Sequence, residues 1–313
     1  MLEILKKTGV LLVTLLLVAL FAFLAFEIIP GDPTTMLLGS EYTPERAEAM
    51  RKAMGLDRNV FLRFFDWLCA FVRGDMGTSY SYAIPVREVL RGKISVTAIL
   101  SLMSWILVTA FSIPLGVALV RYQSKPFGKI GVPLNLVLMA IPSFFLGILL
   151  TYLFGLLLKL FTPGKFIPFQ ENPWACLGYL FFPALAISIP KIAKTVKLLR
   201  ASILSEMKRD YVLTAYSHGS SRWMVIKHHV LRNAILPVVT YLAMSLADIA
   251  ASSIIVEQVF VVPGLGRLLV ASISNRDYPV ALSIVVMIAS VVVIMNYLAD
   301  LLTQIIDPRV RLS

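Results

Sequence analysis

Residues 95–120, SVTAILSLMSWILVTAFSIPLGVALV, decide the fold class. The stretch carries no charged side chain, and it is longer than the ~20 apolar residues that cross a bilayer as a helix. In the hydrocarbon core each backbone N–H and C=O group needs a partner within the protein, and a helix supplies these partners inside one segment. The stretch therefore predicts a transmembrane helix.

Further apolar stretches lie on both sides of this one. The composition agrees with them, because 58% of the 313 residues are hydrophobic and 15% are charged, whereas soluble domains have about 45–50% and about 25%. We therefore expect an all-α, polytopic membrane protein with six transmembrane helices. The other five stretches are residues 9–26, 132–158, 174–189, 234–256 and 280–306.

The first stretch, residues 9–26, follows basic residues as the core of a signal peptide does. It is longer than the roughly 7–15 apolar residues usual in signal peptides, and no A-x-A cleavage site follows it. We therefore interpret it as a retained transmembrane helix.

The charges of the loops predict which side of the membrane each loop occupies. Arg121, Lys125 and Lys129 follow the second span without an acidic residue, and residues 190–233 carry nine basic and two acidic residues. Positively charged loops stay in the cytoplasm, so both loops are expected there. An even number of spans then places both termini in the cytoplasm as well.

This topology divides the chain into four parts. Residues 1–30 hold the N-terminal transmembrane helix, and residues 31–94 form an extracytoplasmic region with short helices. Residues 95–306 form the core transmembrane domain, which includes a cytoplasmic loop over residues 196–233, and residues 307–313 form a cytoplasmic tail.

Two short helices are predicted in the extracytoplasmic region. Thr43 followed by Pro44 is typical of a helix start, and Gly55 is typical of its end. Residues 60–72 repeat phenylalanine at helical spacing, which is typical of an amphipathic helix. This helix can rest on the membrane or on the protein's own spans, or it can present a docking face to an external partner. The pattern leaves these alternatives open.

The loop after the fourth span is neither low in complexity nor a simple basic tail. Its spacing predicts a helix over residues 210–218, which Gly219 ends in the left-handed conformation. Ser220 or Ser221 would cap a second helix over residues 222–231.

Such a pair of helices suits docking on a partner protein, because aromatic anchors surrounded by charge favour a specific interface. A basic loop can also rest on anionic headgroups, and composition alone does not separate the two. The aromatic residues expected to be available are Tyr211, Tyr216 and Trp223.

The chain offers little for catalysis or metal binding. It contains three histidines and two cysteines, and it lacks the P-loop, H-E-x-x-H and G-x-S-x-G motifs. A constellation of paired acids and histidines is missing too, so a membrane enzyme ranks last. We expect no catalytic residue and no metal site, and we leave open whether Cys69 and Cys176 pair.

The loop carries a resemblance to a known family. Residues 210–219, DYVLTAYSHG, followed by residues 229–237, HVLRNAILP, resemble the EAA loop of binding-protein-dependent ABC importer permeases. The resemblance is strongest to the dipeptide, oligopeptide and nickel branch, although Leu213-Thr214-Ala215 replaces the eponymous Glu-Ala-Ala. Further matching motifs are EIIPGDP at 27–33, GDMGTS at 74–79, VEQVF at 256–260, PGLGRLL at 263–269, RDYP at 276–279 and DPR at 307–309.

The resemblance implies the type I importer permease fold in the inner membrane of a bacterial or archaeal cell. Such a permease forms the translocation path for peptides, nickel or related small solutes. It works beside a second permease, a paralogue or another copy, with two cytoplasmic ATP-binding subunits and an extracytoplasmic solute-binding protein. Those subunits bind ATP and magnesium, so this chain is expected to hold no cofactor. It is also expected to bind no nucleic acid.

By the same resemblance, the loop over residues 210–231 is the coupling helix pair that sits in a groove of an ATP-binding subunit. Pro237 would begin the next transmembrane helix. The residues expected to couple to the ATP-binding subunit are Asp210, Tyr211, Ala215, Gly219, Trp223, Arg232, Asn233 and Pro237.

Asp248 is the acidic residue near the centre of the fifth span. A carboxylate there costs about 2.5–3.5 kcal/mol on insertion scales, so it should face protein or water. It either lines the translocation path with Ser245 and Ser252, meeting a cationic group of the cargo, or it is a buried hydrogen-bond partner of another helix. We find no charged partner for it within the membrane. A rival function uses Asp248 as the ion site of an ATP-independent channel or secondary carrier.

Overall fold

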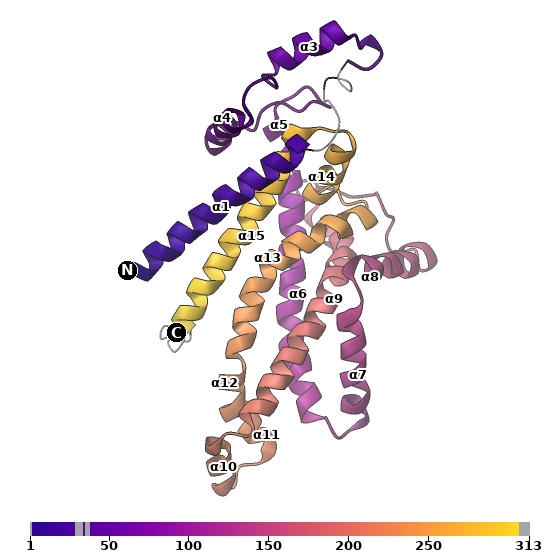
Figure 1. Ribbon diagram of the computed structural model, residues 1–313. Helices are drawn as coiled ribbons and strands as arrows, with labels where there is room; N and C mark the ends of the chain where they lie inside the picture. Colours follow the sequence, from indigo (N-terminus) through magenta and orange to yellow (C-terminus); the bar gives the residue numbers. More distant parts are fainter. Residues whose placement is uncertain (1, 29–33, 35–37, 307–313) are drawn as a thin grey trace. The chain divides into compact units, whose positions relative to one another are not determined.

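The computed structural model of the protein describes residues 2–28, 34 and 38–306, and it is helical as predicted (Figure 1). Every regular element within those residues is a helix. The tail 307–313 and most of the motif at residues 27–33 lie outside the described residues.

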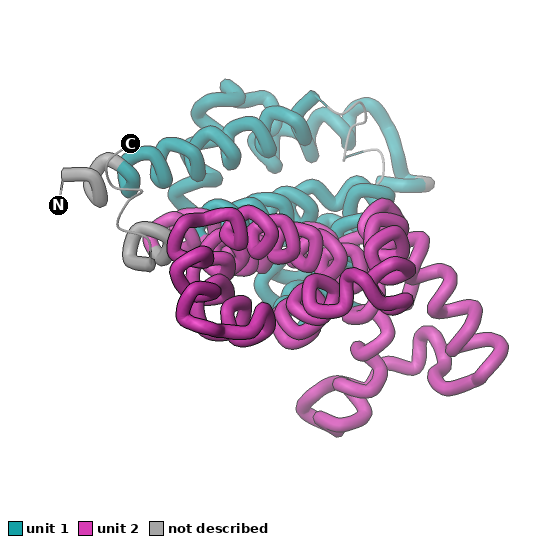
Figure 2. The backbone as a smooth tube through the Cα atoms, turned by 90° about the horizontal axis from the view of Figure 1, so that it is seen from below, with its two compact units in different colours: residues 1–97, 263–294 teal, residues 98–262, 295–313 magenta. Residues whose placement is uncertain are grey.

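The chain packs into two compact units, which Figure 2 colours separately. The first unit consists of residues 1–97 and 263–294, and the second of residues 98–262 and 295–313. The four parts predicted from the sequence follow a different criterion, namely which side of the membrane each segment occupies. That division stays a prediction.

Among the described residues, five helices are long and apolar enough to cross a membrane, or six if one bent pair counts as a single span. This agrees with the expected number of spans. The five are α1 (Leu2–Ile28), α6 (Lys93–Arg121), α9 (Pro173–Glu206), α13 (Leu236–Val259) and α15 (Tyr278–Ile306).

The third apolar stretch is not the continuous helix that we expected over residues 132–158. Instead α7 (Pro126–Ala140) and α8 (Ser143–Leu150), which continues into η2 (Thr151–Leu157), meet at a bend of 102°. Pro142 lies at the break, where it cannot donate a helical hydrogen bond and its ring disfavours a helical residue before it. Pro114, Pro133, Pro183 and Pro190 lie inside helices and end none of them.

Helix α9 is the central element of the second unit. It begins at Pro173 behind Asn172, whose side chain accepts a hydrogen bond from the Ala175 N–H at 3.0 Å. It then continues without interruption beyond the apolar stretch at 174–189 to Glu206. Helices α7, α8 and α13 pack along it. Its fully buried side chains include Leu180, Ile187, Leu199 and Ile203.

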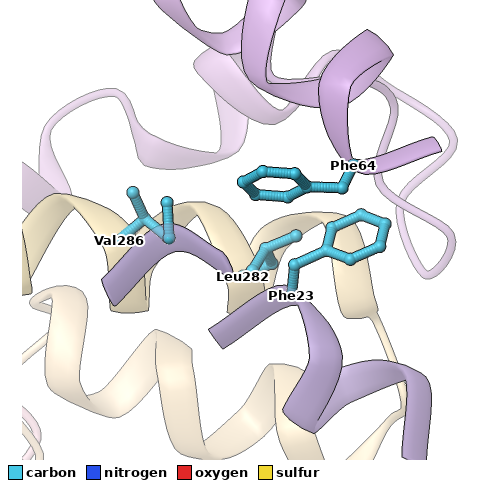
Figure 3. Packing of buried hydrophobic residues seen from close by; sticks show 5 residues of the cluster. Phe23, Phe64, Leu282 and Val286 are labelled. Carbon is cyan, nitrogen blue, oxygen red and sulfur yellow. The ribbon is translucent and has the colours of Figure 1, made fainter. Parts of the chain in front are cut away.

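In the first unit, helix α4 (Val60–Val72) packs on the protein's own spans. The Phe64 ring stands at 5.6 Å from the Phe23 ring of α1, edge to face, beside Leu282 and Val286 of α15 (Figure 3). Phe61 and Phe65 on the same helix stay exposed. One face of α4 therefore follows the first alternative, whereas its other face stays exposed in this unit.

The helix caps predicted in the first unit are confirmed. The Thr43 hydroxyl accepts a hydrogen bond from the Arg46 N–H at 3.3 Å, and α3 (Pro44–Ala53) follows it. Gly55 has a φ of +66°, which suits the glycine that ends a helix.

Both cysteines are free thiols, Cys69 exposed and Cys176 buried.

Gly128 on α7 lies against the backbone of the preceding turn, more tightly than any other described glycine of the second unit. A Cβ atom there would lie 2.4 Å from the Tyr122 carbonyl oxygen and 2.5 Å from the Gln123 Cα atom. Because both are backbone atoms, no side-chain rotation relieves the clash. We expect Gly128→Ala to destabilise the protein by about 1–3 kcal/mol, as overpacking does. Thermal unfolding in detergent checks this.

Gly178→Ala on α9 is the matched control, since no atom lies within 4 Å of its added Cβ atom. The control should unfold at the wild-type temperature. Equal unfolding temperatures for Gly128→Ala and Gly178→Ala would contradict the contact at Gly128.

Candidate functional site

The loop between α9 and α13 folds into short helices beyond the C-terminal end of α9, at the opposite end of the second unit from α8 (Figure 1). Helix α10 (Asp210–Ser217) ends as predicted at Gly219, whose φ is +79°. The Ser220 N–H donates to the Ala215 carbonyl at 3.3 Å, and the Gly219 N–H donates to the Tyr216 carbonyl at 2.9 Å. These two bonds form a Schellman motif, which fixes the chain direction after α10.

The second helix of the loop is interrupted, contrary to the single helix expected over residues 222–231. It consists of α11 (Arg222–Val225), the π-helical turn η3 (Ile226–Val230) and α12 (Leu231–Ala234). Of the two candidate caps, Ser221 is the one used, since its hydroxyl accepts from the Met224 N–H at 3.4 Å. Pro237 is the second residue of α13, as predicted. Sequence periodicity does not distinguish a π turn from an α-helical one, although such turns often mark functional sites.

Tyr211 ties the loop to the end of α9. Its hydroxyl donates to a Glu206 carboxylate oxygen at 2.9 Å, and the Asn233 side chain forms a hydrogen bond with the Tyr211 hydroxyl. The pKa of Tyr211 is raised, mainly because the phenol is buried. The hydrogen bond to Asn233 lowers this pKa, and Glu206 raises it. Tyr211 and Asn233, both predicted as coupling residues, therefore meet in one hydrogen-bonded group.

Trp223 is also held by its own chain. The Arg121 guanidinium, at the last residue of α6, lies 4.2 Å from the centroid of the Trp223 ring. This cation–π contact attaches α11 to the end of a transmembrane helix. Tyr211 and Trp223 are half-buried, so they are not the available anchors that we expected, whereas Tyr216 is exposed.

Two other apolar side chains of the loop are exposed. Leu213 on α10 is 66% exposed and Met224 on α11 is 51% exposed. Val212 and Ala215 of α10 are buried, whereas Leu213 and Tyr216, three residues apart, lie together on the exposed, outer face next to them. Helical spacing in the sequence could have revealed this division of α10. The remaining predicted coupling residues Asp210, Gly219, Arg232 and Pro237 are exposed.

Asp248 has a charged partner, which corrects the expectation that it has none within the membrane. The Lys191 Nζ atom of α9 lies 2.5 Å from Asp248 Oδ2 on α13. The sequence placed Lys191 with the cytoplasmic lysines because it follows the apolar stretch. The pair is uneven in exposure: the lysine side chain is 12% exposed and the aspartate side chain 62%.

The two serines predicted to line the path with Asp248 differ in exposure. The Ser245 side chain is buried and donates to the Leu242 carbonyl of its own helix at 2.7 Å, so it does not share the exposed face of Asp248. The Ser252 hydroxyl, one turn after Asp248, donates to the Asp248 carbonyl at 2.6 Å and stays partly exposed. The structure therefore brings Asp248 and Ser252 together and leaves Ser245 out.

The chain is a member of the family of binding-protein-dependent transport system inner membrane components, which matches residues 112–312, and the family's N-terminal region matches residues 1–88. It is therefore a multi-pass membrane protein and a transport component rather than an enzyme.

Relatives of known description match nearly the whole chain. A putative peptide transport system permease protein of Brucella abortus (strain 2308) is 32% identical over 308 residues, which cover 98% of each chain. A probable peptide ABC transporter permease protein of Sinorhizobium fredii is 30% identical over 311 residues, again 98% of each. The oligopeptide transport system permease protein AppB of Bacillus subtilis is 31% identical over 314 residues, also 98% of each.

Proposed function

We propose that this chain is the membrane-spanning subunit of an ABC importer and forms the path for peptides that a solute-binding protein delivers. The observation that carries the proposal is the pair α10 and α11, whose outer face bears exposed Leu213, Tyr216 and Met224 in a chain of this family. The names of the relatives favour peptides over nickel as cargo. An ATP-independent channel or carrier has no use for such loop helices.

The partners follow from this role. Two cytoplasmic subunits would bind ATP and magnesium, one against the loop helices of this chain and one against those of a second permease. An extracytoplasmic solute-binding protein would load the path from the other side. This chain supplies no catalytic residue, and its contribution is mechanical.

Helix α9 can transmit the movement. Glu206 near its end holds Tyr211 of α10, and Lys191 on the same helix holds Asp248 of α13. Lys191 and Glu206 are fifteen positions apart, which is about 22 Å of helix. If closed ATP-binding subunits bind one arrangement of α10 and α11 better than the other, this difference alone biases the path toward one side.

Copurification tests the class of the complex. Tagged chain expressed with its partners should bring down two nucleotide-binding subunits, and vesicles holding the complex should accumulate peptide only with ATP and binding protein present. Uptake that continues without the nucleotide-binding subunits would refute the proposal and favour a carrier.

Gly219→Val tests the coupling role of the loop. A left-handed conformation costs a residue with a side chain about 1–2 kcal/mol, more for a β-branched one, so the turn between α10 and α11 should reorient. We expect uptake to fall about tenfold or more while the complex still hydrolyses ATP. Gly219→Asn is the control, because asparagine adopts this conformation readily and should retain most of the uptake. Equal uptake in wild type and Gly219→Val would contradict the role of the turn.

A further inference from the structure

Five polar side chains gather on α9 and α13, and we name them the α9–α13 polar cluster. Its centre is the Lys191–Asp248 ion pair. Its members are Lys191, Lys194, Tyr241, Asp248 and Ser252.

The ion pair is open on the side of its acid. The Asp248 carboxylate is largely exposed although it lies in the middle of an apolar helix, and the Lys191 ammonium beside it is largely covered. A carboxylate facing lipid at this depth is unfavourable, so its exposed side must meet water or another polar group. A cationic group can therefore approach Asp248 from the exposed side and replace Lys191 as its partner.

The other end of the cluster has unused binding capacity. The Tyr241 hydroxyl is buried and has no hydrogen-bond partner among the described residues. The Lys194 ammonium lies 5.2 Å from the centroid of the Tyr241 ring. Buried hydroxyl groups are normally satisfied, so this one suggests a missing partner. A carboxylate accepts from both a phenol and an ammonium group.

The cluster contains two ammonium groups on α9, and one carboxylate and one phenol on α13. Tyr241 and Asp248 are seven residues apart, which corresponds to about 10 Å of helix. Three extended peptide residues span roughly the same distance. A ligand with a positive end and a negative end at this separation would complement the cluster at both places.

We propose that the α9–α13 polar cluster binds the free ends of a short peptide, its ammonium at Asp248 and its carboxylate at Lys194, Lys191 and Tyr241. This inference rests on the proposed function as a peptide permease. Opening the Lys191–Asp248 pair leaves two charges that need partners, and breaking such a pair is unfavourable unless both are satisfied. A zwitterionic peptide supplies both partners, whereas a simple inorganic ion supplies only one. The closed pair therefore also keeps the site shut to ions.

Competition binding tests the proposal on the complete permease and ATP-binding complex in nanodiscs, with the solute-binding protein omitted so that its own selectivity does not contribute. Labelled trialanine is displaced by trialanine, by N-acetyl-trialanine and by trialanine amide. Blocking either end should weaken competition about tenfold in the wild type. In Asp248→Asn, N-acetyl-trialanine should compete as well as trialanine, whereas trialanine amide should still compete more weakly. In Lys194→Met, trialanine amide should compete as well as trialanine, whereas N-acetyl-trialanine should still compete more weakly.

Lys197→Met is the matched control, because Lys197 is an exposed lysine one turn further along α9 and outside the cluster. It should behave as wild type. The double variant Lys191→Met/Asp248→Leu removes both charges and avoids an unpaired one, so it should assemble and lose the preference for both ends.

The inference is wrong if the wild type does not distinguish the three peptides, or if each variant weakens all three equally. It is also wrong if the double variant keeps the preference for free ends. Failure of the proposed function looks different, since the wild-type complex would then show no ATP-dependent uptake with its binding protein.

Discussion

Leu213→Lys is expected to abolish ATP-driven uptake and to leave the transmembrane helices folded. Leu213 is 66% exposed on the outer face of α10, so a charged replacement disturbs no packing within the chain. Once α10 sits in a groove of an ATP-binding subunit, the ammonium would be buried without a partner. Such a charge costs about 2–5 kcal/mol, which weakens the contact about thirtyfold or more.

Copurification of the ATP-binding subunits measures the weakened contact, and uptake into vesicles measures the loss of transport. Leu213→Met is the control, because methionine keeps the apolar contact with a similar volume and should remain close to wild type. Met224→Lys should reproduce the loss from the neighbouring helix, since Met224 is also exposed. Normal uptake in both lysine variants would show that this face of the loop does not dock.

Local structure was predictable from the sequence because short-range chemistry determines it. The Thr43 cap, the left-handed Gly219 and the Ser221 cap each depend on groups within a few residues. The transmembrane helices were predictable for a similar reason, since hydropathy over one window is sufficient.

Features that depend on packing between distant segments were not predictable in this way. Lys191 and Asp248 are 57 residues apart, and only the alignment of α9 with α13 brings them together. The contact of Arg121 with Trp223 likewise joins the end of α6 to the loop. Windowed hydropathy also cannot distinguish one span from two helices bent at Pro142, because both contain the same apolar residues.

Asp277 shows the same limit in the first unit. The sequence marks it as part of the motif at residues 276–279 and gives it no role. In the structure it is fully buried between α14 (Leu265–Ser274) and α15. Its carboxylate accepts from the Ser79 hydroxyl, from the Tyr80 N–H at 3.0 Å and from the Ser81 N–H at 3.2 Å. One carboxylate thus holds a turn almost 200 positions earlier in the chain.

Asp277→Ala is therefore expected to destabilise the first unit strongly. The change leaves the buried Ser79 hydroxyl and two part-buried backbone N–H groups without their acceptor, and an unsatisfied buried group costs about 1–3 kcal/mol. The turn at residues 78–85, closed by a bridge between Thr78 and Pro85, should open. A lower thermal unfolding temperature and faster tryptic cleavage at Arg87 measure the two effects.

Two controls separate this role from a general effect of losing an acid. Asp57→Ala removes an exposed carboxylate of the same unit and should change neither the unfolding temperature nor the cleavage rate. Asp277→Asn keeps the shape and one acceptor oxygen, but its amide NH₂ group would face a donor, so its effect should be intermediate. If Asp277→Ala unfolds and is cleaved as the wild type is, the carboxylate does not hold the turn. If it is cleaved faster at an unchanged unfolding temperature, the carboxylate orders the turn without stabilising the unit.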